Sequence, residues 1–257
     1  MLNVAREAAL EAGKFLKYNL GKVKHIERKL GQETNLVTEI DKASEAMIIK
    51  KIKQHYPSHD ILAEESGDHK VKSEYRWVID PLDGTTNYTH GLPIFSVSIG
   101  VEFNGSIVAG VIYDPNTDEM FTAEKGNGAY LNGKRIHVSS CDTLINSLLV
   151  TGFPYNVKDN PGKVVEHFVN LLMEGQGVRR LGSAAIDLAY VAAGRLDGFW
   201  EVFLNPWDKA AGILLVEEAG GTVSDFKNAP GSIYDKNTLA TNGKIHQQMI
   251  AVLGKAL

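Results

Sequence analysis

The sequence predicts a mixed α/β protein of the α+β kind, with both mixed and antiparallel sheets. Two observations support this fold class. In the first half, short apolar runs are separated by the turn pairs Asn104-Gly105 and Asn132-Gly133, which is typical of an antiparallel meander. In the second half, strand-like segments alternate with helix-like segments, which favours a different, mixed arrangement of strands.

The first half begins with two helical segments. Residues 2–20 place alanines and other apolar side chains on one face, which predicts a helix. A second helix is predicted from Thr38 to the residue before Pro57, because Thr38 and Asp41 have the spacing of a capping box in which Asp replaces Glu. We expect short strands that end at Glu64 and Asp80, and further strands over residues 95–101, 107–113, 119–123 and 135–138.

The second half is predicted as alternating strands and helices. Expected strands cover residues 147–152, 198–202, 221–226 and 238–241, and expected helices cover residues 163–173, 183–193, 207–219 and the segment from Lys244. A boundary near residue 145 divides the chain into residues 1–145 and 146–257. Because no linker-like segment marks this boundary, we expect the two halves to pack tightly.

Composition narrows the functional classes. The 257 residues are 44% hydrophobic and 23% charged, as in ordinary soluble globular proteins. A net charge of −4 does not favour a general nucleic-acid binder. The single cysteine, Cys141, allows no internal disulfide and is assigned no role. With no apolar stretch near the ~20 residues that span a bilayer, and no signal-peptide core in residues 1–14, we expect a cytoplasmic protein without a membrane partner.

Four carboxylates lie in segments shaped to bring them together. Glu64 and Asp80 follow short apolar runs, as when a buried strand delivers a side chain to the edge of a sheet, and Asp83 follows closely. Asp208 begins a helical pattern. Clustered carboxylates raise one another's pKa and cannot all stay ionised near pH 7 without cations. Hard oxygen ligands without Cys or His favour Mg²⁺, so the pattern predicts a magnesium site.

The segment Asp80-Pro81-Leu82-Asp83-Gly84 also has the composition of an ordinary turn. The apolar run Trp77-Val78-Ile79 just before it would nevertheless anchor the segment in the core. The fixed φ of Pro81 would then let two carboxylates and a carbonyl converge. The following Gly84 to Asn87 offers backbone N–H groups at a helix start, where phosphate binds readily. The sequence has no P-loop and no Gly-x-Ser-x-Gly elbow, so we expect water to be the nucleophile, activated by metal ions.

Three segments resemble the signatures of the inositol monophosphatase family, and the similarity extends along nearly the whole chain. They are Glu64-Glu65-Ser66, Asp80-Pro81-Leu82-Asp83-Gly84-Thr85-Thr86 and Trp207-Asp208-Lys209-Ala210-Ala211-Gly212. The resemblance implies a layered α-β-α-β-α sandwich of the sugar-phosphatase type with its site where the two halves meet. It also implies a homodimeric, lithium-sensitive phosphoric monoester hydrolase of the bacterial inositol-1-monophosphatase type.

The resemblance further implies which residues act. Residues 1–145 would carry most of the metal ligands, and residues 146–257 would carry Asp208 and substrate contacts. The implied ligands of two or three Mg²⁺ ions are Glu64, Asp80, Asp83, Asp208 and the carbonyl of Leu82. The implied catalytic residues are Glu64, Thr85, which orients the nucleophilic water, and its acidic partner Asp41. The implied substrate-binding residues are Asp83, Gly84, Thr85, Gly182, Ser183, Ala184, Glu201 and Asp208.

Several of these residues have ordinary alternative interpretations. Without the family, Asp41 would be an acid that compensates a helix dipole, Ser183 an N-cap and Glu201 a solvated strand end. Asn205 stands where animal members carry a histidine. A basic cluster is either a solvated loop or a flap that attracts anionic substrate, and it comprises Lys22, Lys24, His25, Arg28 and Lys29. We expect three histidines to lie on the surface or in the core rather than to bind metal, namely His137, His167 and His246.

These patterns lead to one main function and several alternatives. The main prediction is Mg²⁺-dependent hydrolysis of a polyol or sugar monophosphate, in particular inositol 1-phosphate to inositol and phosphate. Fructose 1,6-bisphosphate and 3′-phosphoadenosine phosphates are alternative substrates within the same class. A function of a different class is non-catalytic binding to transcription or RNA machinery. The complete set of carboxylates argues against an inactive enzyme, because unused ligands would be a destabilising cluster of like charge.

Overall fold

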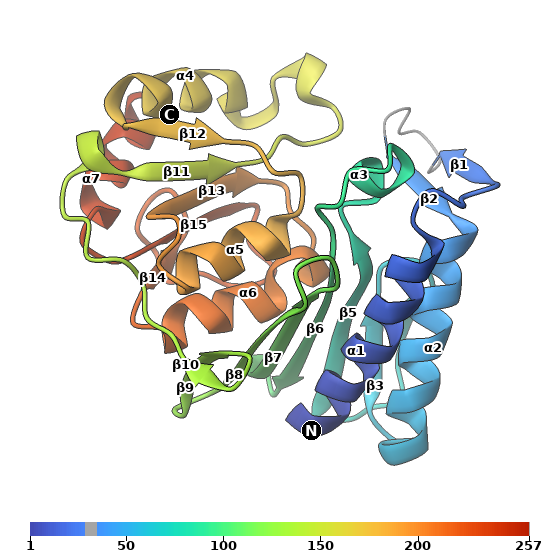
Figure 1. The fold of residues 1–257 in the computed structure, drawn as a ribbon. Coiled ribbons are helices and arrows are strands. Elements are labelled where there is room, and N and C mark those ends of the chain that lie inside the picture. The colour runs from blue at the N-terminus through green and yellow to red at the C-terminus, as the bar shows by residue number, and fades with distance from the viewer. Residues whose placement is uncertain (29–34, 257) are drawn as a thin grey trace.

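The computed structural model describes residues 1–28 and 35–256, and these form five alternating layers of helices and sheets (Figure 1). Helices α1 (Leu2–Asn19) and α2 (Glu39–His55) cover one face of an eight-stranded sheet. Helices α5 (Ala184–Ala192) and α6 (Pro206–Glu218) lie between that sheet and a five-stranded sheet. Helices α4 (Val164–Glu174) and α7 (His246–Leu253) form the last layer. The expected α-β-α-β-α sandwich is therefore confirmed.

The helices begin and end close to the predicted residues. The second helix begins at Thr38, as predicted, because the Thr38 hydroxyl accepts hydrogen bonds from the backbone N–H groups of Ile40 and Asp41. The last helix begins at His246 instead of Lys244, because the Asn242 side chain holds the N–H groups before it in a turn. The remaining helical segments are α3 (Thr85–Thr89) and the 3₁₀ helices Leu144–Asn146, Val157–Asp159, Pro161–Lys163 and Gly254–Ala256.

The larger sheet has the order β10-β9-β8-β7-β6-β5-β3-β4, and its pairs are antiparallel except for the parallel pair β3–β5. Both predicted Asn-Gly hairpins are present, with positive φ at Asn104 and Asn132. The strand predicted over residues 135–138 ends early, because the Val138 N–H donates to the Ala219 carbonyl of another element. The strands are β3 (Asp60–Ala63), β4 (Gly67–His69), β5 (Tyr75–Asp83), β6 (Ser96–Phe103), β7 (Ser106–Asp114), β8 (Glu119–Glu124), β9 (Gly128–Leu131) and β10 (Lys134–Arg135).

The smaller sheet has the order β12-β11-β13-β15-β14 and is mixed, since β11 runs parallel to β12 and β13 while β15 runs antiparallel to β13 and β14. The strand predicted over residues 221–226 is shorter, because the Asp225 side chain accepts hydrogen bonds from Lys227 and Ala229 and turns the chain. Its strands are β11 (Leu148–Thr151), β12 (Gly177–Arg179), β13 (Gly198–Val202), β14 (Thr222–Ser224) and β15 (Asn237–Thr241). A separate two-stranded sheet pairs β1 (Ile26–Arg28) antiparallel with β2 (Leu36–Thr38).

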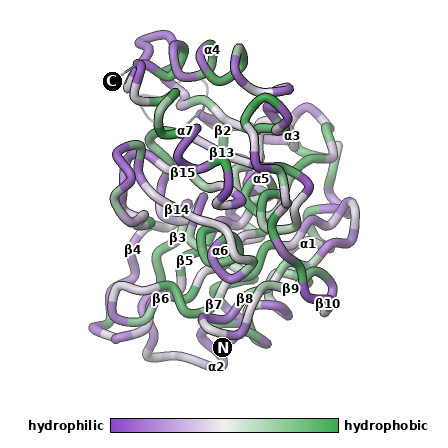
Figure 2. The backbone as a smooth tube through the Cα atoms, turned by 90° about the vertical axis from the view of Figure 1, so that its left-hand side faces the viewer, coloured by the Kyte–Doolittle hydropathy of each residue, from purple (hydrophilic) through white to green (hydrophobic). Residues whose placement is uncertain are grey.

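Helix α6 packs unusually close to the larger sheet. A side chain at Gly100 of β6 would place its Cβ 2.8 Å from Ala210 Cβ, and one at Gly110 of β7 would come 3.0 Å from Ala211 Cα. These glycines therefore let α6 approach the sheet and place its first turn beside the end of β5. The hydrophobic segments of this central region are surrounded by hydrophilic loops (Figure 2).

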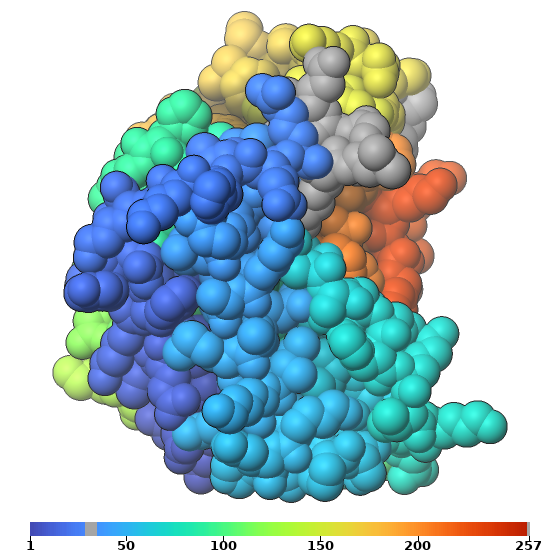
Figure 3. All heavy atoms as spheres, turned by 90° about the vertical axis from the view of Figure 1, so that its right-hand side faces the viewer, coloured from blue at the N-terminus to red at the C-terminus, as the bar shows by residue number. Residues whose placement is uncertain are grey.

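The two halves of the chain meet along a broad surface. One apolar cluster joins Val78 and Phe121 of the first half to Leu188 and Phe199 of the second. In Figure 3, α1 and α2 cover the face toward the viewer, and the second half lies beyond them in yellow to red. No helix among the described residues is long and apolar enough to cross a membrane.

Candidate active site

The ends of two parallel strands bring Glu64 close to Asp80. Glu64 follows β3, and Ala63 is the register partner of Ile79 in β5. The Glu64 N–H also donates to the Ile79 carbonyl oxygen at 3.2 Å. The buried Glu45 of α2 fixes the chain just beyond Glu64, because its carboxylate accepts the N–H groups of Glu65 at 2.8 Å and Ser66 at 2.9 Å. The predicted delivery of both acids to one sheet edge is therefore observed.

The segment from Asp80 to Asp83 interrupts the regular pairing of β5 with β6, since the register shifts between these two residues. The Leu82 N–H donates to Asp80 Oδ1 at 3.0 Å, and the Ser44 hydroxyl of α2 donates to the Pro81 carbonyl at 2.9 Å. Asp80 is 2% exposed, whereas Asp83 is half-buried. The segment is thus a rigid, irregular strand end rather than an ordinary surface turn.

A threonine and an aspartate far apart in sequence form a hydrogen-bonded pair beside this segment. The Thr85 hydroxyl lies 3.0 Å from Asp41 Oδ1 and 3.1 Å from the Leu82 carbonyl oxygen. The other oxygen of Asp41 accepts the Thr38 N–H at 2.9 Å, which completes the capping box of α2. Burial raises the pKa of Asp41, and hydrogen bonds from Thr38 and Thr85 oppose that rise. The two residues that the family resemblance paired are therefore in contact.

Asp83 connects the two halves of the chain at the start of α5. Its Oδ2 accepts the Ser183 hydroxyl at 2.6 Å and the Ala185 N–H at 2.7 Å. Ser183 is also the N-cap of α5, because its hydroxyl accepts the Ile186 N–H. An acid at this helix start is favoured by the helix dipole. Ser183 is consequently the helix N-cap that its position in the sequence predicts, and it also donates a hydrogen bond to Asp83.

Two glycines allow the backbones of both halves to approach each other here. Gly84 has a φ of 101°, and a Cβ on it would lie 2.9 Å from the Ile94 carbonyl oxygen and 3.3 Å from that of Gly182. The amide of Asn87 donates to the carbonyls of Ile94 and Leu181, both at 2.8 Å. These contacts bring Gly84, Thr85, Gly182, Ser183 and Ala184 together at one place.

Asp208 comes to the site from the first turn of α6. Its Oδ2 accepts the Asn205 N–H at 2.7 Å. Burial raises the pKa of Asp208 well above its ordinary value, and the charges of Glu64 and Asp83 add to the rise. The neighbouring Trp207 carbonyl accepts the Ser98 hydroxyl at 3.4 Å, and Ser98 is the register partner of Asp80, so Asp208 lies near the acids at the end of β5.

The electrostatics of the whole group are those of crowded anions. Burial raises the pKa of Asp80, followed by the charges of Glu64, Asp83 and Asp208. Burial also raises the pKa of Asp83 to about 6, although its hydrogen bonds from Ser183 and Ala185 act in the opposite direction. Such a group is stabilised by cations, and its oxygen donors fit a hard divalent ion. In the described part of the chain, no three Asp, Glu, His or Cys side chains converge tightly enough to chelate an ion as they stand.

Glu201 is buried, so the interpretation of this residue as a solvated strand end is wrong. It lies on β13 at 8% exposure. A Cβ on Gly152 would meet the Glu201 carboxylate, so this carboxylate lies directly against the backbone at the end of the neighbouring strand. Burial raises the pKa of Glu201 to about 8, with Arg180 opposing and Asp83 adding to the rise. Glu201 therefore lies near Asp83, at the side of the site formed by the second half.

Sequence reasoning did not identify two buried charged residues near these acids. Asp187 of α5 is 1% exposed, and its Oδ1 has no hydrogen-bond partner among the described residues. Burial and then the charge of Glu201 raise the pKa of Asp187. Lys209 is fully buried and donates to the Asp235 carbonyl and the Thr238 hydroxyl. The burial of Asp187 could have been predicted from the sequence, because this acid interrupts the apolar segment Ala184-Ala185-Ile186-Asp187-Leu188.

The basic cluster and the histidines occupy other positions. Backbone N–H groups of Lys24 and His25 donate to the Glu39 carboxylate at 2.8 and 3.1 Å, and this contact ties their loop to α2. Lys29, the last member of the cluster, lies outside the described residues. Asn205 is exposed at the start of α6. His137 is exposed, whereas His167 and His246 are in the core, where burial lowers the pKa of each ring.

Comparisons with known proteins agree with this geometry. Residues 1–256 match the model of the inositol monophosphatase family. The chain is 48% identical over 253 residues to an inositol-1-monophosphatase from Synechocystis sp., covering 98% of this chain and 88% of that one. It is 45% identical over 252 residues to the Nus factor SuhB of Escherichia coli, covering 98% and 94%. The crystal structure of the extragenic suppressor protein suhB from Bartonella henselae superposes with a TM-score of 0.94 at 42% identity, covering 99% and 98%. The chain therefore belongs to the inositol monophosphatase family and is a phosphoric monoester hydrolase.

Proposed function

We propose that this phosphatase hydrolyses the phosphate monoester of a polyol or sugar in a Mg²⁺-dependent reaction, and that its substrate is inositol 1-phosphate. The observation that carries the proposal is the hydrogen-bonded pair Thr85–Asp41 beside the crowded acids of both halves. A nucleophile-orienting hydroxyl next to a cation-binding group is what metal-assisted hydrolysis requires.

The residues proposed to hold two or three Mg²⁺ ions are Glu64, Asp80, Asp83, Asp208 and the carbonyl of Leu82. Their excess of buried negative charge supports this assignment. When bound, the ions neutralise phosphate charge and make water more acidic. The hydrogen bonds to Asp80, Asp83 and Asp208 hold these side chains in fixed orientations before any ion binds.

Thr85 and Asp41 are proposed to orient the attacking water. The Thr85 hydroxyl donates a hydrogen bond to Asp41 Oδ1, so the Thr85 oxygen is oriented to accept a hydrogen bond from the attacking water. Thr38 holds Asp41 from the opposite side and thereby sets the direction of the pair. Glu64, at the end of β3, is proposed to take up the proton that water loses.

The substrate is proposed to bind between the starts of α3 and α5. Gly84 and Thr85 on one side, and Gly182, Ser183 and Ala184 on the other, would contact the phosphate through backbone N–H and hydroxyl groups. Asp83 and Asp208 would contribute to substrate binding as ligands of the ions that neutralise the phosphate. Glu201, on the wall formed by the second half, would accept hydrogen bonds from the hydroxyls of the polyol. When this carboxyl group is ionised, its negative charge would disfavour a second phosphate and hence fructose 1,6-bisphosphate or 3′-phosphoadenosine substrates.

The name of the Escherichia coli relative, a Nus factor, supports a second candidate role in transcription. We propose this role as an addition to the hydrolase activity. Cytoplasmic location, a homodimeric state and inhibition by Li⁺ are further proposals that follow from the family resemblance. The division into a half with most metal ligands, residues 1–145, and a half with Asp208, residues 146–257, is proposed on the same basis.

The test is phosphate release from a panel of esters by the purified protein, with Mg²⁺ or with EDTA. The panel contains inositol 1-phosphate, fructose 1,6-bisphosphate, 3′-phosphoadenosine 5′-phosphate and an aryl phosphate. We expect the highest kcat/KM on inositol 1-phosphate and loss of turnover in EDTA. Undiminished turnover in EDTA would refute the metal dependence, and a higher kcat/KM on either alternative substrate would replace the proposed one.

A further inference from the structure

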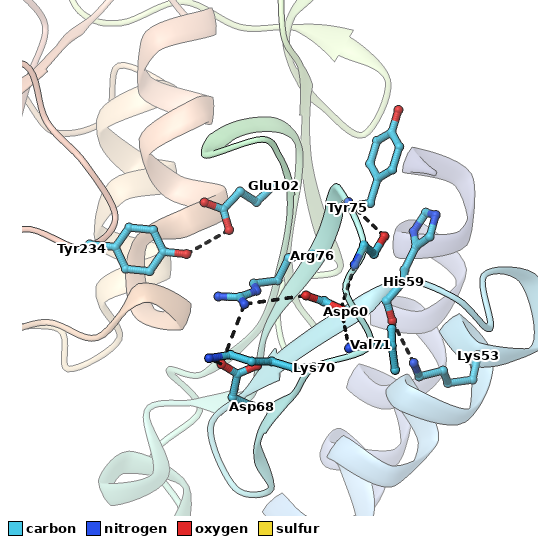
Figure 4. A network of polar contacts seen from close by, with 11 residues as sticks. Lys53, His59, Asp60, Asp68, Lys70, Val71, Tyr75, Arg76, Glu102 and Tyr234 are labelled. Atoms are coloured by element: carbon cyan, nitrogen blue, oxygen red, sulfur yellow. Dashed lines mark hydrogen bonds and ion pairs between the residues drawn. The ribbon is translucent and has the colours of Figure 1, made fainter.

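A hydrogen-bonded clasp joins the two halves of the chain away from the candidate active site (Figure 4). The Tyr234 hydroxyl, in the connection between β14 and β15, donates to Glu102 Oε2 on β6 at 2.9 Å. Arg76 on β5 is the register partner of Glu102 on the neighbouring strand. We define the clasp as these three residues: Arg76, Glu102 and Tyr234.

The clasp is set in a partly buried, negatively charged environment. Glu102 and Asp60 are each 6% exposed. Arg76 lies 3.7 Å from Asp60 and 3.8 Å from Asp68, measured from Nη2 to the nearest carboxylate oxygen. Lys70 also pairs with Asp68, at 3.2 Å between Nζ and Oδ2, so two cations face three acids. The Tyr234 hydroxyl supplies Glu102 with an additional donor. A hydrogen bond to a buried charged acceptor is stronger than an exposed neutral one.

The segment that carries Tyr234 is bonded to the chain on both sides of Asp208. After Asp208, the buried Lys209 donates its ammonium to the Asp235 carbonyl at 2.5 Å and to the Thr238 hydroxyl at 3.2 Å. Before Asp208, the Phe203 N–H donates to the Lys236 carbonyl at 2.5 Å. The first turn of α6 is therefore held by residues 235–238, which directly follow Tyr234.

The turn that contains Tyr234 is itself rigidly bonded. Asp235 Oδ2 accepts the Ser232 N–H at 2.6 Å, and the Asp235 N–H donates to the Ser232 carbonyl at 3.1 Å. A displacement of Tyr234 is consequently passed to Asp235 and Lys209 instead of being absorbed by a loose loop. Glu102 lies four residues beyond Ser98, the partner of Asp80, which is about 13 Å along the strand.

We propose that the clasp positions Asp208 relative to the acids of the first half, so that Tyr234, Glu102 and Lys209 are positioning residues for metal binding. Glu64, Asp80 and Asp83 belong to the first half, whereas Asp208 belongs to the second. A cation bound by acids of both halves requires the two halves to keep a fixed relative position. The clasp supplies one contact that holds them there. This inference rests on the proposed Mg²⁺ site and adds residues outside it.

The test is Mg²⁺ binding by isothermal titration calorimetry to the substrate-free protein, together with kcat and KM at several Mg²⁺ concentrations. Tyr234→Phe removes one hydroxyl from a side chain that is 52% exposed. We expect its Mg²⁺ affinity to fall about three- to tenfold, with an unchanged KM for the ester at saturating Mg²⁺. Glu102→Gln keeps an oxygen acceptor and should lose less affinity than Tyr234→Phe.

Tyr130→Phe is the matched control, because the Tyr130 hydroxyl donates to the Asn127 carbonyl at 3.1 Å within its own hairpin and outside the clasp. It should bind Mg²⁺ like the wild type. Equal Mg²⁺ affinity of Tyr234→Phe and wild type overturns the inference, even if the unfolding temperature falls. If the wild-type protein itself binds no Mg²⁺, the proposed site fails and the inference fails with it.

Discussion

At the scale of single residues, the site depends on acids whose ionisation is opposed by burial and by one another. Glu201 illustrates the consequence for specificity, because burial raises its pKa to about 8. A carboxylate accepts stronger hydrogen bonds than the neutral acid does. The ability of Glu201 to bind polyol hydroxyls should therefore increase with pH, and nearby Mg²⁺ should shift the transition to lower pH.

Substitution of Glu201 tests this pH dependence. In the wild type, kcat/KM on inositol 1-phosphate relative to an aryl phosphate should rise with pH as the carboxyl group ionises. In Glu201→Gln the ratio should be flat. At pH 9 the loss on inositol 1-phosphate should be about ten- to a hundredfold, the value of one charged hydrogen bond. Equal losses on both esters would place Glu201 in the structural frame of the site.

Single residues also show what sequence reasoning can reach. The proximity of Glu64, Asp80, Asp83 and Asp208 could be predicted because each follows a local pattern of apolar residues or begins a helix, and their role as metal ligands stays a prediction. The buried state of Glu201 was not identifiable, because it arises only when β13 packs against Gly152 of the neighbouring strand end. The burial of Lys209 likewise depends on hydrogen bonds to a distant segment, residues 235–238.

At the scale of elements, the start of α2 combines a structural feature with a proposed catalytic one. The capping box that begins the helix also fixes Asp41, because Thr38 contributes its N–H and hydroxyl to the same carboxylate oxygen. Helix stability and the orientation of the Asp41–Thr85 pair are consequently linked. A change in the cap should be detected in both properties.

Thr38→Ala should lower the free energy of unfolding by about 1 kcal/mol, the usual value of an N-cap. It should also lower kcat, because Asp41 loses the hydroxyl that holds it opposite Thr85. Thr38→Ser keeps the hydroxyl and is the matched control. Urea unfolding and steady-state kinetics measure the two effects. A Thr38→Ala protein with reduced stability and wild-type kcat would show that the cap does not position Asp41.

The elements that were predicted correctly are those with local signals. The Asn-Gly hairpins and the capped or glycine-ended helices need no distant partner to be recognised. Three-residue strands such as β12 carry too little sequence pattern, and their existence depends on the strand beside them. The shortened strand at residues 134–135 reflects the same limit, since its end is set by a bond from Val138 to Ala219 of another element.

At the scale of the whole molecule, the site lies where the two halves meet. Asp83 binds the start of α5, Asn87 bonds the carbonyls of Ile94 and Leu181, and the clasp adds a tie farther away. The layered fold was predictable only through the family resemblance, because periodicity alone does not specify how helices and sheets stack. The division near residue 145 stays a prediction, and the central apolar cluster contains residues from both sides of it.

The central claim is that the crowded acids bind the metal ions that drive phosphate ester hydrolysis. Asp83→Asn tests it most directly, because the change removes one negative charge, keeps the side-chain volume and retains an acceptor for the Ser183 hydroxyl. Relief of like-charge repulsion should leave metal-free stability equal or higher. Asp118→Asn, on an exposed turn, is the control.

The measurement is the rate of phosphate release from inositol 1-phosphate at saturating Mg²⁺, with folding of each protein verified by circular dichroism. We predict that Asp83→Asn is folded and loses turnover by at least about a hundredfold, the scale of a lost charged interaction in a transition state. Asp118→Asn should retain wild-type turnover. Full turnover by folded Asp83→Asn would contradict the assignment of these acids as the metal site.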